Sequence, residues 1–391
     1  MGEGAPLITR SILLLLLVLA LDAGGAAAEP GVTDAEIVLG TSSSLSGPLA
    51  FTGEQITKFG VDLYFAVVNE AGGVHGRKLR TIVYDDGYRR QDALANTKKL
   101  VEQDGVFAVI APQGEPALAA LEYLEPRKVS LLFPYQGSSA TRGRRYVFPG
   151  MLLNDRASRM TVDYLGGTRK YRKFAALYQD DAYGKPFLAA IEKDLGRFGL
   201  KLIATEPVKP GAADVSAQVA RLKAARPDVT FLVLVPGPAA LALRARQKIG
   251  WTDTLMVSTG PLTDEKYLAL AADAANGVEG LSYWPDPATS DLPGVGRYRA
   301  SMLKYFPRNE PNRHSLAGYF AGMLFAEAAT RAGRNPTRES LITALESIKG
   351  FESGILPPLT IGPDHETQKH GIWVRVENGR FKPLTDWLKS E

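Results

Sequence analysis

Short apolar runs alternate with longer stretches of helical spacing along most of the chain. Residues 36–40 form a β-rich run that ends in a cluster of Ser, Gly and Pro, and residues 56–68 place apolar side chains three and four positions apart. This pattern predicts a strand, a loop and a helix in that order. The same order is repeated, with strands predicted at 79–84, 107–110 and 129–133 and helices predicted at 91–104 and 117–126.

The alternation restarts at residue 174. Here strands are predicted at 174–178, 201–205, 229–235 and 254–257, and helices at 186–198, 215–225 and 239–249. Strands that alternate with helices indicate parallel sheets covered on both faces. Two such series, separated near residues 150–155, predict an α/β fold with two similar lobes. Helices are expected at 313–332 and 338–347, and a closing hairpin at 372–376 and 380–382 around Asn378-Gly379.

The N-terminus carries a different pattern. An unbroken apolar run from Ile12 to Leu21 follows Arg10 and leads into Ala26-Ala27-Ala28. This layout is typical of a secretory signal peptide, and the run is about half of the roughly 20 residues that span a bilayer. We therefore expect residues 1–28 to be a signal peptide. Because the chain has no Cys, we expect no lipid anchor on an N-terminal Cys and a soluble periplasmic protein.

Composition and charge narrow the possible partners. The 391 residues are 45% hydrophobic and 23% charged, which is a globular composition and a length that suits two medium domains. The formal net charge is only +4. Arg142, Arg144 and Arg145 form the densest basic cluster, but no aromatic side chains are interleaved with it as in a single-strand groove. We expect a solvated loop there and no nucleic-acid partner.

The loops that follow the predicted strands are the candidate binding elements, because ligands of open parallel sheets lie outside the carboxyl ends of the strands. These loops share small, hydroxyl, amide and aromatic residues, which suit a small polar or aromatic solute. They comprise residues 42–52, 112–116, 134–139, 179–184, 236–238 and 258–263.

Enzyme chemistry has little support in the sequence. Four His, no Cys, no nucleophile elbow and no phosphate-binding loop leave few candidates for catalysis. Asp85-Asp86 and Asp180-Asp181 each follow a strand, and we expect both pairs to cap the next helix rather than to act as acid and base. His365 and His370 are five residues apart, and we expect them on a surface loop. We therefore expect no enzyme, no cofactor and no metal site.

Several short stretches resemble one known family when they are taken together and in order. They are Ser46-Gly47-Pro48, residues 69–79 (NEAGGVHGRKL), Tyr84-Asp85-Asp86, Asp181-Ala182-Tyr183-Gly184, Gly277-Val278-Glu279-Gly280 and residues 359–362 (LTIG). The chain resembles the Leu/Ile/Val-binding protein family, which are periplasmic solute receptors of bacterial ABC transporters. The resemblance covers essentially the whole chain after the apolar N-terminus.

The resemblance implies a type I periplasmic-binding fold, with two Rossmann-like lobes that have parallel sheets and are joined by a three-crossover hinge. Lobe 1 would be residues 36–151 plus 285–370, and lobe 2 residues 152–284 plus 371–391. Such a protein, a monomer, would close on a small organic ligand and deliver it to an inner-membrane ABC permease. The alternative is a ligand-sensing receptor that docks on a membrane sensor kinase or chemoreceptor.

The family's binding positions transfer where the loops align. In lobe 1 the resemblance implies an aromatic contact at Phe51 or Thr52, and hydrogen-bond donors for a ligand carboxylate from two loops. These donor loops carry Gln113, Gly114, Glu115, Tyr135, Gln136 and Gly137. In lobe 2 the implied contacts are Tyr183, Val235, Pro236 and Thr259.

One position departs from the family's amino-acid receptors, which carry a Glu in the last of these loops. This chain has Ser258-Thr259-Gly260 there, and a hydroxyl does not neutralise a desolvated ammonium, whose burial without a partner is costly. Glu115 either takes over that role or begins a helix, where a carboxylate suits the helix dipole. We expect an aromatic or branched carboxylate as ligand, with a branched-chain or apolar amino acid as the alternative.

Overall fold

The computed structural model describes residues 29–47, 49–181, 183–262 and 265–390. The expected signal peptide, residues 1–28, lies outside this part of the chain. Over the described ranges, no helix combines the length and the apolar character needed to cross a membrane.

The first lobe is built on a five-stranded sheet in which every pairing is parallel and the strand order is β2-β1-β3-β4-β5. Its long strands are β1 and β2, and three two-residue strands complete it. The predicted strands 107–110 and 129–133 thus shorten to β3 and β4. The bounds are β1 (Glu36–Ser43), β2 (Lys78–Asp85), β3 (Val109–Ile110), β4 (Leu131–Leu132) and β5 (Val147–Phe148).

The second lobe has a seven-stranded sheet in the order β12-β11-β10-β9-β8-β6-β7. Its first five strands in the chain pair in parallel, and the closing hairpin adds two antiparallel strands beside β10. The hairpin turns at Asn378 and Gly379, both with positive φ, as the sequence predicts. The bounds are β6 (Phe174–Gln179), β7 (Leu202–Val208), β8 (Val229–Val233), β9 (Leu255–Ser258), β10 (Glu279–Ser282), β11 (His370–Glu377) and β12 (Arg380–Lys389).

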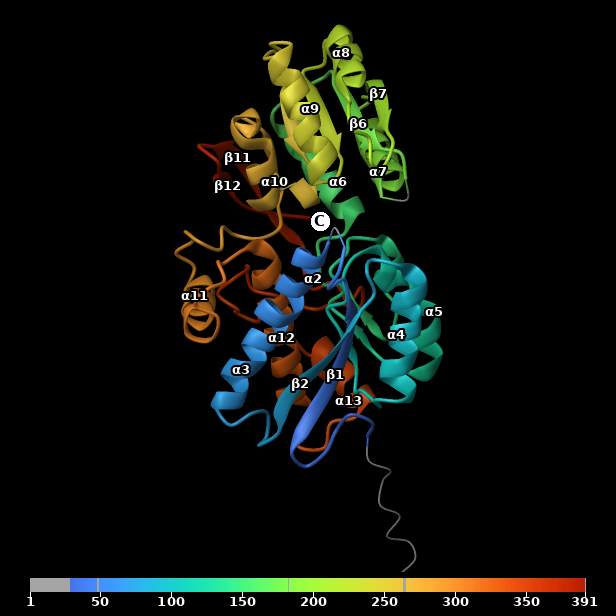
Figure 1. The fold of residues 1–391 in the computed structure, drawn as a ribbon, viewed down its shortest axis with the longest axis vertical. Coiled ribbons are helices and arrows are strands. Elements are labelled where there is room, and N and C mark those ends of the chain that lie inside the picture. The colour runs from blue at the N-terminus through green and yellow to red at the C-terminus, as the bar shows by residue number, and fades with distance from the viewer. Residues whose placement is uncertain (1–28, 48, 182, 263–264, 391) are drawn as a thin grey trace, which may run out of the picture.

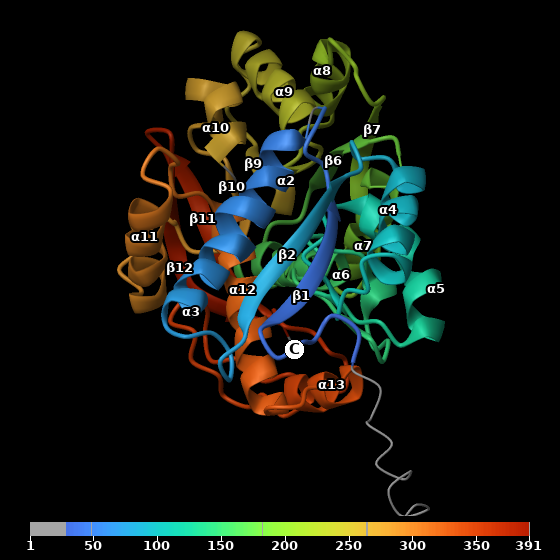
Figure 2. The same cartoon turned by 60° about the horizontal axis from the view of Figure 1, so that its bottom comes forward.

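Helices cover both sheets. Figure 1 shows the two lobes as separate layered bodies along the long axis, and the tilted view of Figure 2 shows β1 and β2 of the first lobe between α3 and α4. The α-helices are α2 (Ala50–Ile56), α3 (Leu63–Glu70), α4 (Arg90–Glu102), α5 (Leu121–Leu124), α6 (Asn154–Val162), α7 (Gly184–Gly196), α8 (Ser216–Ala225), α9 (Pro236–Lys248), α10 (Glu265–Ala271), α11 (Pro293–Tyr305), α12 (Arg313–Ala332) and α13 (Arg338–Glu346). One-turn π-helical segments, residues 57–62 and 163–168, continue α2 and α6.

Helix α12 is the central helix of the first lobe, buried over most of its length. It packs against α2, α3 and the π-helical segment 57–62. The closest approach is at Gly318, where a Cβ would lie 2.1 Å from the carbonyl oxygen of Ile56 and 2.9 Å from the Cα of Gly60. Two glycines therefore let these backbones touch.

The chain passes between the lobes three times: after β5, after β10 and before β11. The hydroxyl of Thr367 on the third crossing donates to the Pro149 carbonyl oxygen on the first, at 2.5 Å. The buried Glu366 carboxylate accepts hydrogen bonds from Arg142 of the first lobe and Arg156 on α6 of the second, each at 2.5 Å. Hydrogen bonds and ion pairs thus join the crossings to one another and to both lobes.

Two local predictions need correction, one for a helix and one for a histidine. The helix predicted at 117–126 is a 3₁₀ segment at 115–120, then α5, then a 3₁₀ turn at 125–127. Pro116 and Pro126, which lack an N–H, break this stretch into pieces. His365 is not on the surface: it is buried, stacks on Phe148 with ring centroids 4.2 Å apart, and bonds Glu346 through Nε2 at 3.0 Å.

The basic cluster at 142–145 faces carboxylates of the chain itself. Arg142 contacts Asp155 and Glu366, Arg144 contacts Glu122 and Glu125, and Arg145 contacts Glu339. These pairs occupy the charges that a phosphate backbone would need.

Candidate functional site

The loops after the strands of the two lobes face one another across the gap between the sheets (Figure 1). On the first lobe, Asp86 is buried and accepts hydrogen bonds from the hydroxyls of Ser42 and Ser44, each at 3.0 Å. Asp85 accepts the backbone N–H groups of Leu45 and Gly87 at 2.8 and 2.9 Å. Burial by itself would raise the pKa of Asp85, but its hydrogen bonds, which include these two, outweigh burial and lower the pKa.

The first aspartate pair therefore has a role other than the one expected. It braces the loop between β1 and α2, whereas no side chain caps the start of α4 at Arg89. The second pair agrees better with the expectation, because Asp181 Oδ1 accepts the N–H groups of Tyr183 and Gly184 at the start of α7, at 2.9 and 3.0 Å.

Gln113, Gly114 and Glu115 lie together after β3, but the side chains of Gln113 and Glu115 already have partners. The buried Gln113 Oε1 accepts the Ser44 N–H at 3.3 Å. Glu115 forms an ion pair with Arg90 on α4. Glu115 also stands in the first turn of a 3₁₀ segment, so the structure shows it as an ion-paired residue at the start of a helical segment.

Tyr88 covers Gly114. A Cβ on Gly114, whose φ is +68°, would come within 2.4 Å of the Tyr88 ring. Tyr88 is 39% exposed. Partial burial and the negative charges of Asp181 and Asp86 raise the pKa of Tyr88, and since Asp181 belongs to the second lobe, Tyr88 lies where the lobes meet.

Tyr135, Phe51 and His314 form an aromatic group on the first lobe. The Tyr135 hydroxyl and His314 Nδ1 share a hydrogen bond of 2.9 Å, and the Phe51 ring stands edge-on to the His314 ring at 6.3 Å. Phe51 is 44% exposed at the start of α2, and Thr52 beside it is half-buried. This group offers ring faces and edges to a bound solute.

Gln136 follows Tyr135 and is almost fully buried. Its Oε1 accepts the Ser138 N–H at 2.5 Å, while its Nε2 has no hydrogen-bond partner among the described residues. A buried donor without an acceptor is costly, so this N–H group is suited to a ligand oxygen. Gly137 accepts the Asn154 N–H at 2.7 Å through its carbonyl oxygen and thereby holds the loop against α6.

On the second lobe, Tyr183 and Thr259 are hydrogen-bonded to each other. The Thr259 hydroxyl donates to the Leu232 carbonyl oxygen at 3.1 Å and lies 3.1 Å from the Tyr183 hydroxyl. A hydroxyl has one proton, so Tyr183 is the donor to Thr259. Burial raises the pKa of Tyr183, and the charge of Asp181 adds to the effect.

Tyr283 completes the group of tyrosines. It is buried just after β10, and a Cβ on Gly260 would lie 2.5 Å from its hydroxyl oxygen. Burial raises its pKa, and the neighbouring phenols of Tyr183 and Tyr135 add to the effect. Four tyrosines from separate loops, two in each half of the gap, therefore line one region.

Val235 and Pro236 are not joined to this group. Val235 is 37% exposed and Pro236 is the first residue of α9. No hydrogen bond or ring contact links either residue to the four tyrosines in the described part of the chain.

Sequence reasoning missed Tyr88, Tyr283, His314 and the ion pair between Arg313 and Glu265, which joins α12 of the first lobe to α10 of the second. Tyr88 could have been found, because it follows Tyr84-Asp85-Asp86 at the end of a strand. His314 is 179 residues away from Tyr135 and begins a helix, so no local pattern links the two.

The carboxylates that border the gap in the described ranges all have partners. Asp86 binds hydroxyls, Asp181 binds backbone N–H groups, Glu115 pairs with Arg90, and Glu265 pairs with Arg313. The region that the four tyrosines line thus offers a solute phenols, the His314 ring and the Gln136 amide. No set of three or more His, Asp or Glu side chains in the described residues is arranged for a metal ion.

Comparison with known proteins gives consistent matches. A family model described as periplasmic binding protein matches residues 36–380. The chain is 26% identical to an amino acid binding protein of Pseudomonas aeruginosa, over 77% of this chain and 80% of that protein. It is 25% identical to Leu/Ile/Val-binding protein homolog 3 of Brucella melitensis, over 82% and 86% respectively.

Among solved structures, a fatty acid ABC transporter substrate-binding protein from Thermomonospora curvata superimposes with a TM-score of 0.82 at 25% identity, covering 94% of this chain and 96% of that one. The matches confirm the resemblance to Leu/Ile/Val-binding proteins that the motifs indicate, and the fold expected from it.

Proposed function

Because the chain belongs to the periplasmic binding protein family, we propose that it captures a small organic solute between its two lobes, outside the cytoplasmic membrane, and delivers it to an ABC permease. The observation that carries this proposal is the convergence of Tyr88, Tyr135, Tyr183 and Tyr283 on one region from loops of both lobes. We take residues 36–151 with 285–370, and 152–284 with 371–391, as the two units that move.

The ligand we propose is an aromatic or branched carboxylate without an amine. Thr259 stands where the family's amino-acid receptors carry a Glu, and its hydroxyl donates to a carbonyl oxygen. An ammonium would need a carboxylate, and those described at the gap are already paired. In support, the relatives bear names that include amino acid binding and fatty acid transport, so the family's ligands are not restricted to amines.

The contacts we propose follow from the geometry. Gln136 Nε2 donates to the carboxylate, Phe51 and Tyr135 pack on the apolar body from the first lobe with Thr52 beside them, and Tyr183 closes from the second. Val235 and Pro236 would reach the ligand only at the rim. The ligand favours the closed state by its difference in affinity between the closed and open forms.

A thermal-shift screen tests the ligand class. One panel holds aromatic and branched carboxylates, and the other holds the α-amino acids with the same side chains. Binding to the folded state raises the melting temperature by mass action, so we expect stabilisation by the first panel only. Stabilisation by the amino acids alone would overturn the amine-free ligand, and silence from both panels would contradict the proposed solute class altogether.

A further inference from the structure

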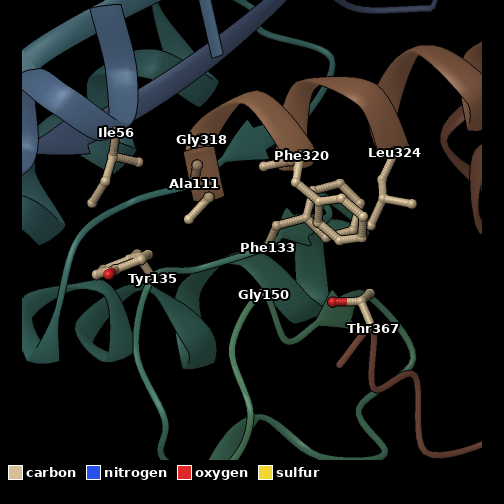
Figure 3. A pocket seen from close by; sticks show the side chains of 11 residues that line it. Ile56, Ala111, Phe133, Tyr135, Gly150, Gly318, Phe320, Leu324 and Thr367 are labelled. Atoms are coloured by element: carbon tan, nitrogen blue, oxygen red, sulfur yellow. The ribbon is translucent and has the colours of Figure 1, made fainter. Parts of the chain in front are cut away.

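A small pocket lies inside the first lobe, beside Tyr135 (Figure 3). Helix α12 forms one wall, and the ends of β3 and β4 with the first and third crossings form the other. The free volume is about 10 Å³, which is close to the space of one water molecule. A methyl group is of similar size.

Most of the side chains that line the pocket are apolar. Phe133, Phe320, Leu324 and Ala321 contribute apolar surface, and the Thr367 hydroxyl, which also lines it, already donates to the Pro149 carbonyl oxygen. A buried water molecule needs two to four polar partners, and cavities lined by carbon stay dry or take apolar groups. The wall therefore favours an apolar group over water.

Tyr135 belongs both to this pocket and to the gap between the lobes. Its hydroxyl oxygen points away from Phe320 and Leu324 (Figure 3) and bonds His314 on the side of the gap. Ala111 and Phe133, which also line the pocket after strands, are buried, whereas Tyr135 is partly exposed and lies close enough to Tyr283 for their phenols to interact. Entry to the pocket is therefore past the Tyr135 ring.

We propose that this pocket is a subsite for the terminal methyl group of the ligand, and that Ala321 and Leu324 set how far the ligand extends. The inference rests on the proposed function and adds to it, because it specifies the apolar end of the carboxylate. Because the subsite has room for one methyl group, one additional carbon on the ligand should increase its affinity, and a second carbon should not fit.

Isothermal titration with benzoate, 4-methylbenzoate and 4-ethylbenzoate, and with 3-methylbutanoate and 4-methylpentanoate, tests the subsite. Burial of one carbon increases affinity about fourfold. We expect the wild-type protein to bind one series better than the other. Within that series, one additional carbon should increase affinity by this factor, and the next carbon should decrease it.

Ala321→Val fills the pocket. We therefore expect the longer ligands of each series to lose their fourfold advantage, while the shortest ligand keeps its affinity. Ala326→Val is the matched control: the residue is equally buried on the same helix but does not line the pocket, and its series should follow the wild type. Leu324→Ala enlarges the pocket and should move the optimum to a longer ligand.

Two results overturn the inference and are separable. If carboxylates bind but the length preference is the same in wild type, Ala321→Val and Leu324→Ala, the subsite is wrong and the proposed function stands. If none of these carboxylates binds the wild-type protein, both are wrong. Melting curves of each variant establish that it is folded, and the two pocket variants change the volume in opposite directions.

Discussion

At the residue scale, the Thr259 hydroxyl donates a hydrogen bond to the Leu232 carbonyl oxygen and accepts one from the Tyr183 hydroxyl. This chain of two hydrogen bonds fixes the Tyr183 ring at the edge of the second lobe. It also uses the phenol proton within the protein, so that only the lone pairs of the phenol oxygen are left for a ligand. A ligand carboxylate gains nothing from these lone pairs, so Tyr183 contributes through its ring.

This view of Tyr183 leads to a prediction. Tyr183→Ala should weaken carboxylate binding roughly fivefold to 150-fold, since a buried ring contributes on the order of 1–3 kcal/mol. Tyr183→Phe should bind within about threefold of wild type. Tyr305→Ala, far from the gap beside Glu70, serves as control in the same titration. An equal loss in Phe and Ala variants would show that the hydroxyl carries the contact.

A second prediction concerns Asp62, at the end of the π-helical segment 57–62. Burial raises its pKa from 3.8 to about 6. The folded state then binds a proton that the unfolded state has released, so this group's contribution to stability is full below pH 4 and falls as pH rises to about 6. The difference is roughly 3 kcal/mol at most.

Asp62→Asn should remove this dependence. Urea denaturation at pH 4.5 and 7.5 is the measurement, and the wild type should lose stability relative to the Asn variant as pH rises. A carboxylate whose pKa is lowered has the opposite effect, because its contribution to stability grows as pH rises. Asp155 is an example: burial alone would raise its pKa, but Arg142 lowers it. The difference between the two proteins therefore carries the result, and parallel pH curves would contradict it.

The loops that end strands can be predicted as binding elements from the sequence, and the family resemblance implies Phe51, Tyr135, Tyr183 and Thr259 within them. What the sequence does not reveal is which polar groups are already used. Gln113 carries an amide donor, but its Nε2 donates to the Leu49 carbonyl oxygen at 3.5 Å, and its Oε1 accepts the Ser44 N–H. His314 reaches Tyr135 only because α12 crosses the first lobe, and that crossing depends on tertiary packing.

At the scale of elements, the regular units were predictable and the irregular ones were not. The β-α alternation, α12 and the hairpin at Asn378-Gly379 have strong periodic or turn signals. By contrast, β5 and β10 are two and four residues long, too short for a period to appear. The antiparallel place of β11 beside β10 is a matter of sheet assembly, which a local pattern does not encode.

The crossing of α12 on the segment 57–62 yields a third prediction. Gly318→Ala should destabilise the protein by roughly 2 kcal/mol or more, because its Cβ would overlap the Ile56 carbonyl oxygen. Gly296→Ala on α11 is the matched control. No atom lies within 4 Å of its Cβ position, so Ala should be neutral or stabilise by about 0.5–1 kcal/mol. Equal melting temperatures for the two variants would disprove the tight crossing.

At the scale of the whole molecule, the Arg313–Glu265 ion pair links α12 to α10 across the gap. Arg313 is 4% exposed, lies over the Phe381 ring at 4.8 Å, and begins a helix. A cation is unfavourable at a helix N-terminus, so the carboxylate from the other lobe offsets a local disadvantage. The pair therefore favours the arrangement of the two lobes that this structure shows.

A fourth prediction follows from this pair. Arg313→Met should shift the ligand-free protein towards open forms and weaken ligand binding, by roughly a factor of two to ten, the range of about 0.5–1.4 kcal/mol. Small-angle scattering should show a larger radius of gyration. Arg331→Met is the control, because Arg331 pairs with Glu327 on the same helix. A radius unchanged from wild type would exclude the link.

The threefold passage between the lobes also determines the order in which the molecule can be completed as the chain lengthens from its N-terminus. The first lobe lacks its central helix until residue 332 is present, although its sheet ends at residue 148. The second sheet lacks β11 and β12 until residue 389, and without them Trp373 is missing from the core. Neither lobe is therefore a complete folding unit until the last fifth of the chain has been synthesised.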